Sequence, residues 1–257
     1  MPQPSSINSL GIPFLELQSV DSTNNYARKL IHEGLAYHGM AIFAHEQVAG
    51  KGQRGKIWIT EKDANIVLSI VINPQPIQIT EQFHLIACVA VAIHDFFSRY
   101  AGDDTRIKWP NDLYWQDRKA GGILIENMVR TGYPDIDRWQ WAIIGTGINI
   151  NQTSFSPGLI NPVSLNQITG KSFDPVVLAK ELCRLLDEKF KQLIDGGFGK
   201  IFSEYLSVLY KRNENIKLRK ENRVFEATLI GITPTGKLIA KHSIEEKFDF
   251  GEIEWII

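Results

Sequence analysis

The sequence predicts an α+β protein in which a larger domain is followed by a small all-β module. Its 257 residues, 44% hydrophobic and 22% charged, suffice for one domain with a sizeable core plus an appendage. Strand-like and helix-like stretches mix as far as residue 211, and only short strand-like stretches follow. We therefore expect domains at residues 1–211 and 212–257, the second of the size of an SH3-like barrel.

In the larger domain, β-branched and aromatic residues predict six strands. These are Phe14–Gln18, Ala41–His45, Asn65–Ile72, Thr105–Trp109, Gly121–Glu126 and Gln140–Ile150. In the second domain, strands are expected at Ile216–Leu218, Phe225–Gly231, Lys237–Lys241 and Glu252–Ile256. The stretch Thr233–Gly236 has proline and glycine where a turn favours them.

Four helices are expected from apolar residues at helical spacing. The first follows the N-cap candidates of residues 21–23 and stops at Gly34. The second covers Thr80–Tyr100. The third begins at Asp174, with Pro175 in the first helical position, which favours a helix start. The fourth covers Phe202–Leu209.

Composition predicts a soluble, cytoplasmic protein. The 28 basic and 29 acidic residues leave a net charge of −1, so no bulk attraction to nucleic acid or membrane is expected. Two distant cysteines suit a reducing compartment. The amino terminus lacks the pattern of a signal peptide, and the longest apolar run, Leu85–Ile93, is too short to span a bilayer. The six histidines show no metal-ligand spacing.

The stretch Gly50–Trp58, GKGQRGKIW, fits two phosphate-binding patterns at once. It matches the dinucleotide fingerprint, and it matches the P-loop except that Ile57 replaces the hydroxyl residue. Both loops need a helix directly after them, because the helix N-terminus supplies donors to the phosphate. Here β-branched and aromatic residues follow, so both interpretations fail.

What remains is a flexible loop with three glycines and the cations Lys51, Arg54 and Lys56 between two strands. We expect this loop to close over an anion, and a solvated hairpin tip is the alternative. Two further stretches suit close approach of a ligand. One is Lys108–Glu126, which contains Asn111-Asp112 in an expected turn and Lys119 beside two glycines; the other is Gly145–Asn151.

The three stretches GKGQRGKIW, KWPNDLYWQDRKAGGILIE and GTGININ, in this order and spacing, closely resemble the biotin protein ligase family. The residues from Asp21 to Asn24 and Gln47 also match. The resemblance covers most of the chain. It implies a mixed β-sheet catalytic domain of the class II synthetase type and an SH3-like β-barrel at the carboxyl end.

The resemblance implies an ATP-dependent enzyme, a biotin–[biotin carboxyl-carrier protein] ligase. Biotin's carboxylate attacks the α-phosphate of ATP and forms biotinyl-5′-AMP, which then acylates a lysine on a carrier protein of a biotin-dependent carboxylase. ATP, Mg²⁺ and biotin are the expected ligands. The alternative is a lipoate or octanoate ligase or transferase of related fold, which uses the same carboxylate-to-lysine chemistry.

The resemblance also implies roles for single residues. Lys119, Asp112 and Lys51 are the catalytic candidates, with Asp112 also the candidate Mg²⁺ ligand. The biotin-binding candidates are Ser22, Thr23, Asn24, Gln47, Lys51, Gly52, Gln53, Lys119 and Gly122. The candidates for ATP or adenylate binding are Gly50, Arg54, Asn111 and Asn149.

The glycine-rich loop departs from the family pattern at two positions, Lys51 and Gln53, where relatives often have arginine. Lysine keeps the charge but loses the bidentate fork, and glutamine loses the charge. We therefore expect this enzyme to release its adenylate intermediate more readily than relatives that have arginine there. Some family members add an amino-terminal DNA-binding domain; because Ser22-Thr23 lies so near the start, the monofunctional type without DNA binding is expected here. A homodimer is expected from the family.

Overall fold

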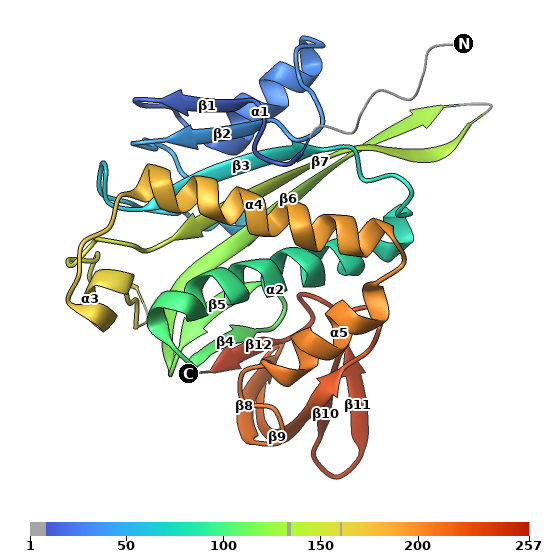
Figure 1. Ribbon diagram of the computed structural model, residues 1–257. Helices are drawn as coiled ribbons and strands as arrows, with labels where there is room; N and C mark the ends of the chain where they lie inside the picture. The colour runs from blue at the N-terminus through green and yellow to red at the C-terminus, as the bar shows by residue number, and fades with distance from the viewer. Residues whose placement is uncertain (1–8, 133–134, 160, 257) are drawn as a thin grey trace.

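The computed structural model describes residues 9–132, 135–159 and 161–256. A seven-stranded mixed sheet in the order β1-β2-β3-β7-β6-β5-β4 forms the larger domain (Figure 1). Its strands are β1 (Phe14–Leu17), β2 (Ala41–Ala44), β3 (Ile66–Ile72), β4 (Thr105–Lys108), β5 (Asp112–Trp115), β6 (Arg118–Gly132) and β7 (Asp135–Ile148). Only β1 and β2 pair in parallel; the other neighbours are antiparallel.

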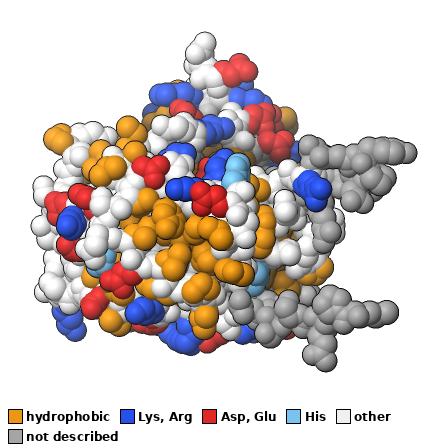
Figure 2. All heavy atoms as spheres, turned by 90° about the horizontal axis from the view of Figure 1, so that it is seen from above, with side chains coloured by type: hydrophobic (Ala, Val, Ile, Leu, Met, Phe, Trp, Pro, Cys, Tyr) orange, Lys and Arg blue, Asp and Glu red, His pale blue; other side chains and the backbone are white. Residues whose placement is uncertain are grey.

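The two faces of the sheet are covered by different helices, as alternation along the strands requires. On one face, Phe43 and Ile144 pack with α2 (Gln82–Ala101), α4 (Pro175–Ile194) and α5 (Phe198–Ser207) in the main core. On the other face, the adjacent Ile42 and Ile143 join Ala27 of α1 (Thr23–His32) in a smaller core. Seen from above, apolar side chains gather in the middle of the surface and charged ones surround them (Figure 2).

Helix boundaries follow the signals in the sequence. Asp174 accepts hydrogen bonds from the backbone N–H groups of Val176 and Val177, with Pro175 at the first helical position. Gly34 takes the left-handed conformation just after α1. The segment Ile79–Ala101 is long and apolar enough to cross a membrane, but 56% of its apolar window is buried inside the protein. It is therefore the central core helix of the domain.

The carboxyl-terminal module is a five-stranded antiparallel sheet in the order β11-β10-β9-β8-β12. Its strands are β8 (Asn215–Lys220), β9 (Arg223–Ile232), β10 (Leu238–Lys241), β11 (Glu245–Phe248) and β12 (Glu254–Ile256). The expected turn is present, because Gly236 donates its N–H to the Thr233 carbonyl. A small all-β module is confirmed; its likeness to an SH3-like barrel stays a prediction. Its apolar residues belong to the same core as those of α2 and α4.

Four expectations about elements were wrong or incomplete. Asp112 does not lie in a turn: it opens β5, and the turns around this short strand lie at Trp109–Asn111 and at Gln116-Asp117. The sequence EEKF of β11 was missed because three of its four residues are charged. The short helix α3 (Leu165–Thr169) was also missed, although Ser164 and Gln167 form a capping box there. Strands β6 and β7 are longer than expected.

Candidate active site

A cavity of 740 Å³ lies over the sheet and collects residues from distant parts of the chain. They come from the start of α1, the glycine-rich loop, the turn before β5, the start of β6, the end of β7 and the carboxyl-terminal module. Of the predicted site residues, the lining includes Ser22, Thr23, Asn24, Gln47, Lys51, Gly52, Gln53, Arg54, Asn111, Asp112, Lys119, Gly122 and Asn149. Gly50 is the one candidate outside this set.

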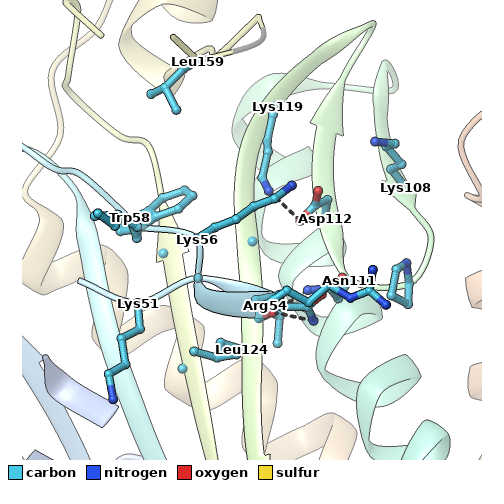
Figure 3. Close-up of a pocket in the computed structure, with 18 of the residues that line it drawn as sticks. Lys51, Arg54, Lys56, Trp58, Lys108, Asn111, Asp112, Lys119, Leu124 and Leu159 are labelled. Carbon is cyan, nitrogen blue, oxygen red and sulfur yellow. Dashed lines mark hydrogen bonds and ion pairs between the residues drawn. The ribbon is translucent and has the colours of Figure 1, made fainter. Parts of the chain in front are cut away.

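Lys119 and Asp112 form an ion pair at the centre of the cavity, with Nζ 2.7 Å from Oδ1 (Figure 3). Their side chains are 33% and 24% exposed, so a ligand can reach both. Antiparallel pairing of β5 with β6 sets Asp112 opposite Gly122. A Cβ on Gly122 would lie 3.3 Å from Asp112 Oδ1, so glycine leaves room beside the pair.

The backbone of Lys119 is fixed from its outer side by the segment before α3. Its N–H donates to the Asn161 carbonyl (2.8 Å), and its carbonyl accepts from the N–H of Val163 (2.9 Å). Asn149 holds the same segment, since its side chain donates to the Val163 carbonyl at 3.1 Å. The Asn149 side-chain amide therefore organises the wall of the cavity.

A buried polar cluster closes one end of the cavity. Gln47 Oε1 accepts from both the backbone N–H and the hydroxyl of Thr23. Ser69 Oγ lies 2.7 Å from Thr23 Oγ1 and 2.6 Å from Asn24 Oδ1. Ser22 is 2% exposed and its hydroxyl makes no helix cap. Hydroxyl and amide groups packed this densely suit a polar ligand head that must be hydrogen-bonded when buried.

Two charged residues stand behind this cluster. Asn24 donates to Glu126 Oε2 at 2.9 Å, and the other oxygen of Glu126 accepts from Arg28 at 2.5 Å. This chain orients the Asn24 amide, so that its oxygen faces Ser69 and its nitrogen faces Glu126.

The glycine-rich loop covers the cavity without forming an α-helix. A single turn, η1 (Gln53–Gly55), follows Gly52, and Lys51 forms a bridge with Ile57. Figure 3 shows Lys56 extending toward the Lys119–Asp112 pair and Lys51 pointing away from it. The Lys51 ammonium instead donates to Asn25 Oδ1 at 2.5 Å. In this structure the loop cation near the central pair is Lys56, which the sequence had not singled out for a role.

Two glycines of β7 allow close approach, as the sequence suggested, but the approaching groups belong to the chain itself. A Cβ on Gly147 would lie 2.5 Å from the ring of Trp58, and one on Gly145 would lie 2.4 Å from Asn24 Oδ1. The glycines thus let the Trp58 ring pack closely against the strand and let Asn24 reach Ser69. Gly50 is equally crowded, since a Cβ there would meet the Trp58 carbonyl at 2.3 Å.

The turn before β5 is held by Asn111, which is 5% exposed. Its side-chain nitrogen donates to the Ile123 carbonyl, and the Ile123 N–H donates to the Asn111 carbonyl. The Asn111 side-chain oxygen is not used in these bonds. Asn111 and Asp112 thus bring an amide and a carboxylate, two side chains with hard oxygen atoms, to the lining of the cavity.

These oxygens fit Mg²⁺ in the form in which it accompanies a nucleotide. Mg²⁺ commonly takes one or two carboxylates and completes its shell with water and substrate phosphates. Throughout the described ranges, no group of three or more His, Cys, Asp or Glu residues could hold a metal. A single carboxylate suits a metal ion that arrives bound to phosphate. When bound, the Mg²⁺ ion would neutralise part of the phosphate charge there.

Lys108 on β4 also lines the cavity, beyond Asp112 as seen from Lys119 (Figure 3). Burial lowers the pKa of Lys108 to about 8; Asp112 opposes this effect, while Lys119 and Lys56 add to it. The carboxyl-terminal module contributes several lining residues. They are Arg219, Phe250, Gly251, Ile253, Glu254, Trp255 and Ile256. Arg54 lies over the Phe250 ring, 5.4 Å from its centroid, so the loop rests on this module.

The sequence motifs predicted most residues of the cavity, but they did not predict roles for residues that reach it only through tertiary contacts. Ser69 carried a signal, since it is the one polar residue in the buried strand IVLSIVI. Trp58 and Lys108 stood inside quoted motifs without a role, and no local pattern distinguished Trp255.

The molecule combines a mixed-sheet domain with a glycine-rich, cationic loop over a cavity that contains an ammonium–carboxylate pair. A family model described as the biotin/lipoate A/B protein ligase family matches residues 16–149. The chain belongs to this family.

Relatives and solved structures agree with this membership. The chain is 31% identical over 233 residues to the biotin–[acetyl-CoA-carboxylase] ligase of Paracoccus denitrificans, covering 88% of this chain and 92% of that protein. It is 30% identical over 224 residues to the bifunctional ligase/repressor BirA of Bacillus spizizenii, covering 86% of this chain and 66% of the relative. The chain thus spans about two thirds of that relative's length.

The fold is that of a solved biotin protein ligase from Aquifex aeolicus, in complex with biotin and ATP. The TM-score is 0.77 at 22% identity, with 94% of this chain and 97% of that chain covered. The expected mixed-sheet architecture is thereby confirmed.

Proposed function

We propose that this protein is an ATP-dependent biotin ligase. It forms biotinyl-5′-AMP from biotin and ATP and transfers the biotinyl group to a lysine of a biotin carboxyl carrier protein. The observation that carries the proposal is the Lys119–Asp112 pair, 2.7 Å apart, between a buried polar cluster and a cationic loop. The relatives named as biotin ligases support it.

The polar cluster would take the ureido head of biotin, because this group needs hydrogen-bonding partners once buried. The proposed contacts are Ser22, Thr23, Asn24 and Gln47, with Gly52, Gln53 and Gly122 along the walls. The biotin carboxylate would then reach Lys119. Gly50, Arg54, Asn111 and Asn149 are the proposed nucleotide side, and Asp112 the proposed Mg²⁺ ligand.

Lys119 acts by charge. Its ammonium neutralises the carboxylate as the latter approaches the α-phosphate, and it then stabilises the negative charge at the new anhydride. Holding both anions in one enclosed site converts their encounter into a unimolecular step and keeps water from the mixed anhydride. In the second step, Asp112 orients the carrier lysine amine for attack on the acyl carbon. Lys51 is proposed to swing from Asn25 to the phosphates when ligand is bound.

Domain roles and context belong to the same proposal. Residues 1–211 carry the chemistry, and residues 212–257 close the cavity from one side. The protein acts in the cytoplasm, without nucleic acid or membrane as a partner, and a homodimer stays a prediction that sedimentation analysis would test.

Exchange of labelled pyrophosphate into ATP tests the proposed reaction, because reversible adenylate formation requires the correct acid. Biotin is expected to stimulate exchange, whereas lipoate and octanoate leave it at background. Exchange stimulated by lipoate but not biotin would replace the proposal with the lipoate alternative, which the family description also includes.

A further inference from the structure

Lys108 occupies a cage made by both domains. Its ammonium lies 5.1 Å from the ring centroid of Tyr114 on β5 and 5.3 Å from that of Trp255 on β12. The Tyr114 hydroxyl is a weak acceptor at 3.4 Å. An ammonium over aromatic faces is attracted by their negative quadrupoles, and this attraction fixes where the charge sits.

This ammonium lacks a matching anion. In the described part of the chain Lys108 forms no ion pair, and the nearby carboxylate of Asp112 is already bonded to Lys119. The neighbouring charges of Lys119 and Lys56 have the same sign. A partly buried cation beside two others is unfavourable without a counter-charge, so the arrangement favours entry of a multiply charged anion.

The position of Lys108 along the cavity indicates which anion. Sheet order places β3 and β7, near the polar cluster, on one side of β6 and β5, with β4 at the outer edge. The register sets Lys108 opposite Asp112, and Asp112 opposite Gly122. An acid whose head lies in the polar cluster and whose carboxylate meets Lys119 therefore leaves Lys108 beyond the reacting phosphorus, on the side of the departing phosphates.

We propose that Lys108 binds the pyrophosphate leaving group, and that Trp255 and Tyr114 are positioning residues that hold its ammonium there. This inference rests on the proposed ligase function. A carboxylate oxygen forms a bond to the α-phosphorus, and the bond from that phosphorus to the bridging oxygen of the β-phosphate breaks. The electron pair of that bond leaves with pyrophosphate, where Lys108 stabilises it. No proton moves in this step.

The test separates the two half-reactions, because pyrophosphate takes part only in the first. Lys108→Met is expected to lower biotin-dependent pyrophosphate exchange by roughly a hundredfold, the usual loss when one preorganised charge contact is removed. Transfer from preformed biotinyl-5′-AMP to a carrier domain should stay at the wild-type rate. Lys108→Arg, which keeps the charge, should recover part of the exchange rate.

Lys220→Met is the matched control. Lys220 also lies over an aromatic ring, that of Phe248 at 5.3 Å, but it pairs with Glu252 and lies outside the cavity. The same substitution there should leave exchange unchanged.

Trp255 has its own test. Trp255→Phe should keep the KM for pyrophosphate in the exchange reaction close to that of the wild type. Trp255→Leu should raise this KM about tenfold, because the aromatic face is lost, without changing the transfer step. Thermal melting would establish that each variant is folded.

The outcomes distinguish this inference from the proposed function. Absence of biotin-dependent exchange in the wild type would overturn the ligase proposal itself. Exchange in the wild type that persists in folded Lys108→Met and Lys108→Gln, or a loss shared equally by the transfer step, would overturn the role of Lys108. An equal change in the KM for pyrophosphate in Trp255→Phe and Trp255→Leu would contradict the positioning role of the Trp255 ring.

Discussion

The ammonium of Lys119 on β6 lies 2.7 Å from a carboxylate oxygen of Asp112 on β5. The two residues are only seven apart in sequence, but a two-residue turn at Gln116-Asp117 brings them face to face. Both side chains remain accessible to ligand, and a partly exposed pair of this kind contributes only about 0–1 kcal/mol to stability. The pair is therefore better explained by the reaction than by the fold.

Removing this ammonium should abolish the first half-reaction without unfolding the protein. For Lys119→Ala we expect biotinyl-5′-AMP synthesis to fall at least about a hundredfold, because the carboxylate and phosphate then approach without a neutralising charge. The melting temperature should change little. Lys180→Ala, at an exposed lysine over the Phe14 ring and outside the cavity, is the control. Synthesis at the wild-type rate in Lys119→Ala would refute the assignment.

Gln53 should allow biotinyl-5′-AMP to dissociate from the site before the transfer step. It lines the cavity and donates only weakly, at 3.5 Å, to the Ile123 carbonyl, and it carries no charge for the adenylate phosphate. We expect Gln53→Arg to slow release of biotinyl-5′-AMP into solution, because a guanidinium can bind phosphate by two hydrogen bonds. Release is measured by trapping free adenylate over time. An unchanged release rate would show that position 53 does not control retention.

Gly147 should tolerate no side chain. Gly147→Ala would place a methyl group 2.5 Å from Trp58, so the indole must leave β7. We expect a loss of about 1–3 kcal/mol in unfolding free energy and faster proteolysis of the glycine-rich loop. Gly199→Ala in α5 meets nothing within 4 Å and should instead stabilise by about 1 kcal/mol. Equal melting temperatures for the two variants would contradict the packing described.

His45 should make stability depend on pH. Its ring lies 2.8 Å from Glu16 and 2.6 Å from Asp63, and the bond to Glu16, then that to Asp63, raises the pKa of His45 above 6.5. A raised folded-state pKa gives stabilisation that is full below pH 6.5 and is lost as pH rises through the folded value. As pH rises above about 6.5, the advantage of wild type over His45→Gln in denaturant unfolding should therefore shrink. An advantage that grows with pH would contradict this.

Much of the fold was predictable because its signals are local. Apolar runs predict the strands β2 and β3, and Asp174 with Pro175 predicts the start of the helix α4. Strand β11 did not, since its Glu-Glu-Lys sequence is polar and only its pairing with β10 makes it a strand. Strand β5 was hidden for a related reason: its four residues are flanked by turns that read as one loop.

The site was predictable where motifs supplied residues and not where contacts decide. All but one of the proposed ligand residues line one cavity. Which cation of the loop faces Lys119 could not be read from spacing, and Lys56 rather than Lys51 lies there (Figure 3). The pairing of Trp255 with Lys108 joins residues 147 positions apart, for which no pattern along the chain gives a signal.

The mass of a carrier domain would show whether this protein transfers biotin. Incubated with this protein, biotin and MgATP, a biotin carboxyl carrier domain should gain the mass of one biotinyl group, on a single lysine located by peptide sequencing. The gain should vanish when ATP is omitted or Lys119 is replaced by alanine. A carrier that stays unmodified with the wild-type protein, or that is modified equally by Lys119→Ala, would contradict the account.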